Sequence, residues 1–85
     1  MFTNKSKTGT NNICGKVIAD RRKEIGKSQR QLADALQIAG LDIDKNAIQR
    51  IEAGKRFVTD IELTYFSKVL GLSYEILLSR DGAVD

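Results

Sequence analysis

The 85-residue chain has no histidine, no proline and a single cysteine, Cys14. Without histidine there is no imidazole to serve as a general base or a metal ligand, and one cysteine alone forms neither an internal disulfide nor a zinc site. A Walker lysine loop and a dinucleotide-binding glycine fingerprint are also absent from the sequence. We therefore expect no enzymatic activity, no cofactor and no bound metal.

Long apolar runs are missing as well. No stretch approaches the ~20 apolar residues of a membrane-spanning helix, and the first residues lack the apolar segment of a signal peptide. A lone cysteine fits a reducing compartment. These features predict a cytoplasmic protein that binds no membrane. The length leaves little room for a separate ligand domain, so no small-molecule ligand is expected.

The composition, 41% hydrophobic with 6% aromatic residues, is typical of one compact helical domain. Residues 1–12 are polar and lack apolar periodicity, so we expect a flexible tail there. Lys5 and Lys7 can make this tail a DNA-contacting arm, although a simple solvated tail is the favoured alternative. The folded domain is expected over residues 13–79, followed by a polar tail over 80–85.

Start and stop signals divide the domain into five helices. Two capping boxes, Ser28 with Gln31 and Thr59 with Glu62, begin the second and fourth helices. The expected helices cover about 13–25, 28–39, 44–53, 59–70 and 74–79, and four of them end at a glycine. No segment alternates apolar and polar residues as a β-strand does, so the expected fold class is all-α.

Apolar spacing predicts which side chains face the core. In the first helix these are Ile13, Val17, Ile18 and Ile25, with Asn12 as the cap. Arg21 falls near the same stripe, and its stem can lie along the edge of the core. In the second helix the buried stripe consists of Leu32, Ala35, Leu36 and Ala39, while Ala33 permits close helix packing.

Charge is distributed unevenly along the chain. Residues 1–27 carry seven cations and two anions, and residues 45–56 carry four cations and one anion. The segments 28–44 and 57–85 are net acidic. Folding can therefore gather the two basic segments on one face, which favours a polyanionic partner.

The segment 44–53 has the most distinctive side chains. Asp44 can cap it, Ile43 can pack against Ile48, and Gly54 suits the position after its end. Ile48 and Ile51 share one face. The opposite face carries side chains that hydrogen-bond base edges in a DNA major groove: Lys45, Asn46, Gln49 and Arg50. A helix that is merely solvated would more often mix Glu and Lys there.

Three sequence runs together resemble the lambda-repressor-like, Xre/Cro-type helix-turn-helix family. They are SQRQLA at 28–33, IQRIEAGKR at 48–56, and the apolar pattern from Leu63 to Leu78. The resemblance covers about residues 12–79. It implies a compact five-helix DNA-binding domain, usually a transcriptional repressor or phage regulator that works as a dimer.

The resemblance also implies roles for individual residues. The base-reading positions correspond to Lys45, Asn46 and Gln49, and Arg50 is expected to reach a base or a phosphate. Contacts to backbone phosphates are expected from Gln29, Lys55 and Arg56. Lys27 and Arg22 are weaker phosphate candidates, for which solvation is the alternative. Ala47 can touch a thymine methyl or pack inward.

Two positions depart from the family pattern. The chain between Leu36 and Ile48 is about five residues longer than usual, which leaves the presentation of the third helix open. Arg21 stands where a small or aliphatic residue is common.

We expect a sequence-specific regulator of transcription that binds double-stranded DNA, a repressor rather than an activator. A homodimer is expected because one recognition helix contacts few base pairs. Its interface can lie on the last helix, at Tyr74, Ile76, Leu77 and Leu78, unless these residues only close the core. The alternative is a protein-interaction module, an antitoxin or adaptor, on the same fold. Single-stranded RNA is disfavoured because the basic segments lack stacking aromatics.

Overall fold

The computed structural model describes residues 10–78. This part of the chain forms five helices and no strand. The helices are α1 (Gly15–Glu24), α2 (Gln29–Ala39), α3 (Lys45–Glu52), α4 (Asp60–Leu70) and α5 (Tyr74–Leu78). The predicted all-α, five-helix fold is therefore confirmed. The predictions for residues 1–9 and 79–85 lie outside the described residues.

The predicted local signals start and end the helices. Ser28 Oγ accepts from Gln31 N at 3.0 Å while Gln31 Oε1 accepts from Ser28 N at 2.8 Å, which completes the first capping box. Thr59 and Glu62 form the second box at the start of α4. Both boxes satisfy helix N–H groups that have no intrahelical acceptor.

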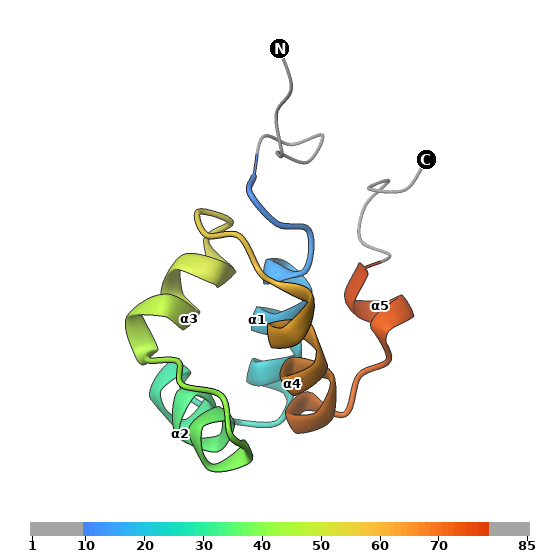
Figure 1. Cartoon of the computed structure of the whole chain (residues 1–85). Coiled ribbons are helices and arrows are strands. Elements are labelled where there is room, and N and C mark those ends of the chain that lie inside the picture. The colour runs from blue at the N-terminus through green and yellow to red at the C-terminus, as the bar shows by residue number, and fades with distance from the viewer. Residues whose placement is uncertain (1–9, 79–85) are drawn as a thin grey trace.

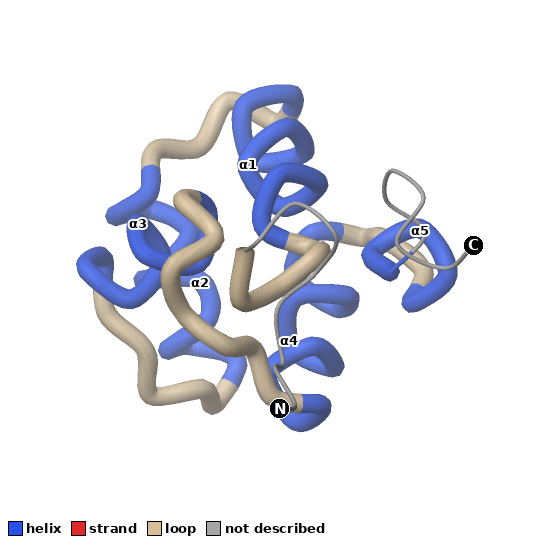
Figure 2. Tube along the Cα trace, turned by 90° about the horizontal axis from the view of Figure 1, so that it is seen from above, coloured by secondary structure: helices blue, strands red, loops and turns tan. Residues whose placement is uncertain are grey.

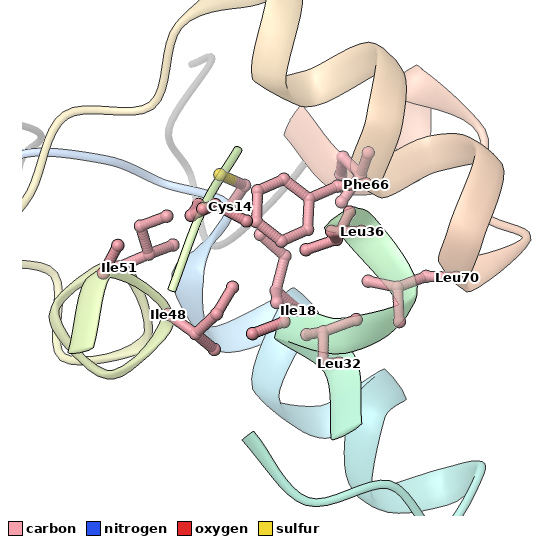
Figure 3. Packing of buried hydrophobic residues seen from close by; sticks show 12 residues of the cluster. Cys14, Ile18, Leu32, Leu36, Ile48, Ile51, Phe66 and Leu70 are labelled. Atoms are coloured by element: carbon pink, nitrogen blue, oxygen red, sulfur yellow. The ribbon is translucent and has the colours of Figure 1, made fainter. Parts of the chain in front are cut away.

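One core joins all five helices, and Figure 3 shows its packing. Side chains from α1, α2, α3 and α4 converge on Phe66, which is fully buried. The other large, fully buried side chains of the cluster are Ile18, Leu32, Leu36, Ile48, Ile51, Leu70 and, from α5, Leu77. Burial of each such side chain contributes on the order of 2 kcal/mol relative to exposure. The core therefore fixes one face of α3 against the rest of the domain.

The first helix departs from the prediction at both ends. It begins at Gly15 rather than near Ile13, and Cys14 takes the buried place while Ile13 is only half-buried. Ile25 lies beyond the last turn and is 37% exposed, because the helix ends at Glu24. Arg21 lies at the edge of the core as predicted, and its Nε donates to Leu70 O at 2.9 Å.

The buried stripe of α2 contains the predicted Leu32 and Leu36 but differs from the prediction at its alanines. Ala33 is buried with Leu32 and Leu36, whereas Ala35 and Ala39 are half-buried. The small, buried Ala33 side chain permits close packing of α2, against which both α3 and α4 pack.

The connection from α2 to α3 lies in the stretch expected to be longer than the family pattern, and it is anchored to the rest of the fold. It covers residues 40–44 and begins at Gly40, whose φ of +116° suits glycine. Ile43 is buried, and its carbonyl accepts from Gln37 Nε2 at 2.7 Å. The turn therefore holds α3 in one position against α2.

The helices place α3 and α5 on opposite sides of the molecule. In Figures 1 and 2, α1 and α4 lie between α5 and the pair α2 and α3. Among the described residues, no helix is long and apolar enough to cross a membrane.

Candidate nucleic-acid interface

The local sequence of α3 separates a buried face from a polar one. Asp44 Oδ1 accepts from Ala47 N at 2.8 Å and caps the helix. Ile48 and Ile51 are completely buried, and Ala47 is only 8% exposed. Ala47 therefore packs inward, the second of its two expected roles. The helix ends at Glu52, and Gly54, two residues later, takes a left-handed φ of +76°.

The opposite face of α3 consists of exposed polar side chains, and these are the four predicted base-reading residues: Lys45, Asn46, Gln49 and Arg50. Within residues 10–78, these four side chains form no hydrogen bond or ion pair. Each keeps its full set of donors for a ligand. The structure brings the four residues together on one helix of eight residues.

Arg22 and Glu52, at the end of α3, are engaged with each other within the protein. Arg22 binds both carboxylate oxygens of Glu52, with Nε–Oε2 at 2.7 Å and Nη2–Oε1 at 3.0 Å. The two side chains are only 11% and 8% exposed. The hydrogen bond from Arg22 to Glu52 raises the pKa of the guanidinium further above its ordinary value. This ion pair ties the end of α1 to the end of α3.

Gln29, a predicted phosphate ligand, joins the same network. Its Nε2 donates to Glu52 Oε1 at 2.9 Å. A primary amide carries two N–H groups, so one remains available to an anion. The first N–H groups of α2 lie at the same end of the helix, where the helix dipole also favours a negative charge. Arg22 is less accessible to a ligand, because its side chain is only 11% exposed and its Nη1 also donates to Lys27 O at 2.8 Å.

The two cations after α3 differ in their surroundings. Arg56 binds Glu62 with both terminal nitrogens, Nη1–Oε1 at 3.0 Å and Nη2–Oε2 at 2.9 Å. The bond from Arg56 is the main reason that the pKa of Glu62 is lowered. Lys55 is exposed and forms no ion pair among the described residues. Of the two, Lys55 has the charge that is free to meet a phosphate.

Lys27 is half-buried at the turn between α1 and α2, and it likewise has no ion pair within residues 10–78. It precedes Gln29 by two residues, so both predicted phosphate ligands lie at the start of α2.

Sequence reasoning missed three contributors to the site. The carboxylates of Glu52 and Glu62 and the amide of Asn12 hold the cations and the end of α3, through bonds from Arg22, Arg56 and Asn12. Arg22 and Glu52 are 30 residues apart, and Asn12 and Ile51 are 39 apart. No local pattern signals such pairs.

A capped second helix, a short turn and a third helix with a free polar face define a helix-turn-helix protein of the DNA-binding class. The family model described as helix-turn-helix matches residues 18–77, which is most of the chain. The chain therefore belongs to the helix-turn-helix family of the Xre/Cro, lambda-repressor-like type. Members of such families are typically not enzymes. No curated protein and no solved structure matches the chain significantly.

Proposed function

We propose that the protein is a sequence-specific regulator of transcription that inserts α3 into the major groove of double-stranded DNA. The observation that carries this proposal is the exposed, unpaired set Lys45, Asn46, Gln49 and Arg50 on one face of α3. Asn and Gln bind adenine with two hydrogen bonds, and Lys and Arg bind guanine. The neighbouring Arg22 and Arg56 are already paired with Glu52 and Glu62, whereas this face is free to receive a ligand.

Phosphate contacts would supply most of the affinity. We assign them to Lys55, which follows α3, and to Lys27 and the free N–H of Gln29 at the start of α2, where Gln29 contacts Glu52 in the last turn of α3. Arg56 contributes less, since Glu62 neutralises its charge. Phosphate contacts fix the register of a protein on DNA, while base contacts carry the specificity.

Repression is the simplest regulatory outcome for this domain. Occupying a promoter sequence requires only DNA binding, whereas activation also requires a surface for the transcription machinery. Placing the selected sequence within a promoter should therefore lower expression of a reporter gene when the protein is present.

A homodimer suits the arrangement of the helices. Tyr74, Ile76 and Leu78 on α5 are 51%, 49% and 38% exposed, whereas Leu77 is buried in the core. If two copies met through α5, their α3 helices would lie at the outer sides of the pair, as Figures 1 and 2 imply. Two recognition helices one DNA turn apart, ~34 Å, read a palindromic site.

Selection of bound sequences from a random duplex pool, followed by a salt titration, tests the proposal. We expect an enriched palindromic motif and an affinity that falls steeply with salt. Failure to enrich any motif, together with salt-insensitive binding, would overturn it. An antitoxin or adaptor would instead require a protein partner, and one that has lost DNA binding would show no enrichment.

A further inference from the structure

Residues 10–12, here called the N-terminal strap, lie against the end of α3 and the loop after it rather than in the tail expected over 1–12. Asn11 N donates to Gly54 O at 2.8 Å and Asn11 Nδ2 donates to Lys55 O at 3.0 Å. Asn12 Nδ2 donates to Arg56 O at 2.7 Å. Three consecutive carbonyls after α3 are thus held by two neighbouring asparagines, so the folded domain extends to the strap.

The Asn12 side chain contacts three parts of the fold, whereas a helix cap contacts only its own helix. Besides Arg56 O, its Nδ2 reaches Ile51 O in the last turn of α3 at 3.1 Å. Its Oδ1 accepts from Gly15 N at 2.8 Å, at the first residue of α1. One carboxamide therefore links the start of α1, the end of α3 and the loop that follows. Only an amide provides the donors and the acceptor together.

Two glycines allow this close approach. A Cβ on Gly15 would collide with Ile51 O, so α1 and α3 meet at their backbones. A Cβ on Gly54 would lie 2.7 Å from Thr10 Cγ2, and its φ of +76° also disfavours other residues. Because the strap packs directly on the backbone of α3 and its loop, loss of the strap would free that backbone.

The loop held in this way carries Lys55, the free cation next to the base-reading face. Its other side is fixed by the ion pair of Arg56 with Glu62, so the backbone of residues 54–56 is held from two directions. Placement of Lys55 Nζ at a phosphate depends on the position of this backbone. The register of α3 in the groove depends on the same contact.

We propose that Asn12 is a positioning residue for DNA binding, which through the strap sets the end of α3 and presents Lys55 to the phosphate backbone. This inference rests on the proposed function and deepens it. Asn12 itself needs no contact with DNA. Its effect is transmitted by the carbonyls of Ile51 and Arg56.

The test compares Asn12→Ala with Ser67→Ala in the full chain. Ser67 Oγ donates to Leu72 O between α4 and α5, so the control also loses a side-chain bond to the backbone, away from α3. Binding to the selected duplex is measured by fluorescence anisotropy over a salt series, at a temperature where circular dichroism shows each variant folded. We expect about a tenfold loss of affinity and a salt slope smaller by about 1 for Asn12→Ala, and less than a twofold loss for Ser67→Ala.

A double-mutant cycle separates positioning from general destabilisation. If Asn12 acts through Lys55, then Asn12→Ala should cost much less affinity in a Lys55→Ala background than in the wild type. Full additivity of the two changes, or an unchanged salt slope for Asn12→Ala, would overturn the proposal. Should Asn12→Ala fail to fold, Asn11→Ala takes its place. It removes a single side-chain bond, to Lys55 O, and we expect it also to reduce the salt slope of DNA binding.

Amide hydrogen exchange, measured without DNA, tests the structural role of Asn12 separately from the proposed DNA-binding function. Asn12→Ala should speed exchange at Gly54 N and Lys55 N, which donate to Ile51 O and Arg50 O, while the amides of α4 keep their protection. Unchanged exchange at these amides would show that Asn12 does not hold the end of α3, whether or not the protein binds DNA. Faster exchange in a protein that binds no duplex would refute the proposed function and, with it, the role of Asn12 in DNA binding.

Discussion

Arg22 and Glu52 form a two-point ion pair between the ends of α1 and α3, with only about a tenth of either side chain exposed. A buried pair of this kind contributes little compared with well-packed apolar residues, but loss of one partner leaves a charge without compensation. The pair therefore makes the position of α3 sensitive to either residue.

Arg22→Met should lower the free energy of unfolding by about 3 kcal/mol, because Glu52 stays buried with only Gln29 as a donor. The double variant Arg22→Met/Glu52→Leu should recover most of that loss. Urea unfolding followed by circular dichroism measures both. Lys16→Met, which breaks an exposed pair with Asp20, is the control and should change stability by less than about 0.5 kcal/mol. A loss no larger than that of the control would contradict the role assigned to the Arg22–Glu52 pair.

Glu62 should make stability depend on acid pH. Its pKa is lowered from the ordinary value of 4.5, chiefly by the hydrogen bond from Arg56. A carboxyl with a lowered folded-state pKa stabilises the protein above its unfolded pKa, and that contribution disappears as the pH falls through the folded-state value. Glu62→Gln should therefore be less stable than the wild type by about 1–2 kcal/mol at pH 7.

The same variant provides the check on this pH dependence. The difference in unfolding free energy between wild type and Glu62→Gln should stay constant down to about pH 5 and shrink below pH 4.5. Urea unfolding at a series of pH values measures it. A difference that persists unchanged at pH 3 would show that the Arg56–Glu62 pair is not its source.

DNA binding should distinguish base-reading from phosphate-binding residues. Gln49→Ala should cost about 1–3 kcal/mol at one base pair and relax the sequence preference there. Lys55→Ala should weaken binding to all sequences alike and reduce the salt slope by about 1. Lys68→Ala, which removes the same charge from α4, is the control. Equal effects of Lys55→Ala and Lys68→Ala would mean that net charge, and not a placed contact, governs binding.

Cys14 should be chemically inert in the folded protein. Its side chain is 1% exposed, and burial is the largest cause that raises the pKa of the thiol to about 11. Thiol reagents attack the thiolate, so at pH 8 the folded protein should react at least about a hundredfold more slowly than the urea-unfolded chain. Ellman's reagent measures both rates. Comparable rates would show that Cys14 is accessible and open to redox chemistry.

The fold was predictable where its signals are local. The boxes at Ser28 and Thr59 each lie within four residues, and glycine after a helix is recognisable without any tertiary information. The polar face of α3 followed from spacing alone. The partners of Arg22, Arg56 and Asn12 did not, because a single sequence does not show which distant carboxylates and carbonyls folding brings together. Arg56 was expected to contact a phosphate, and the sequence did not show that Glu62, six residues away, would bind it.

The dimer proposal predicts that charge on α5 separates the two copies. Tyr74→Glu should weaken self-association and reduce affinity for a palindromic duplex at least about tenfold, while affinity for an isolated half-site stays the same. Ile38→Glu is a matched control, since Ile38 on α2 is 88% exposed and the change adds the same charge. Sedimentation velocity at micromolar concentration, with and without DNA, measures the assembly. A wild-type protein that stays monomeric on the palindromic duplex would overturn the proposal, and a dimer that Tyr74→Glu leaves intact would place the interface away from α5.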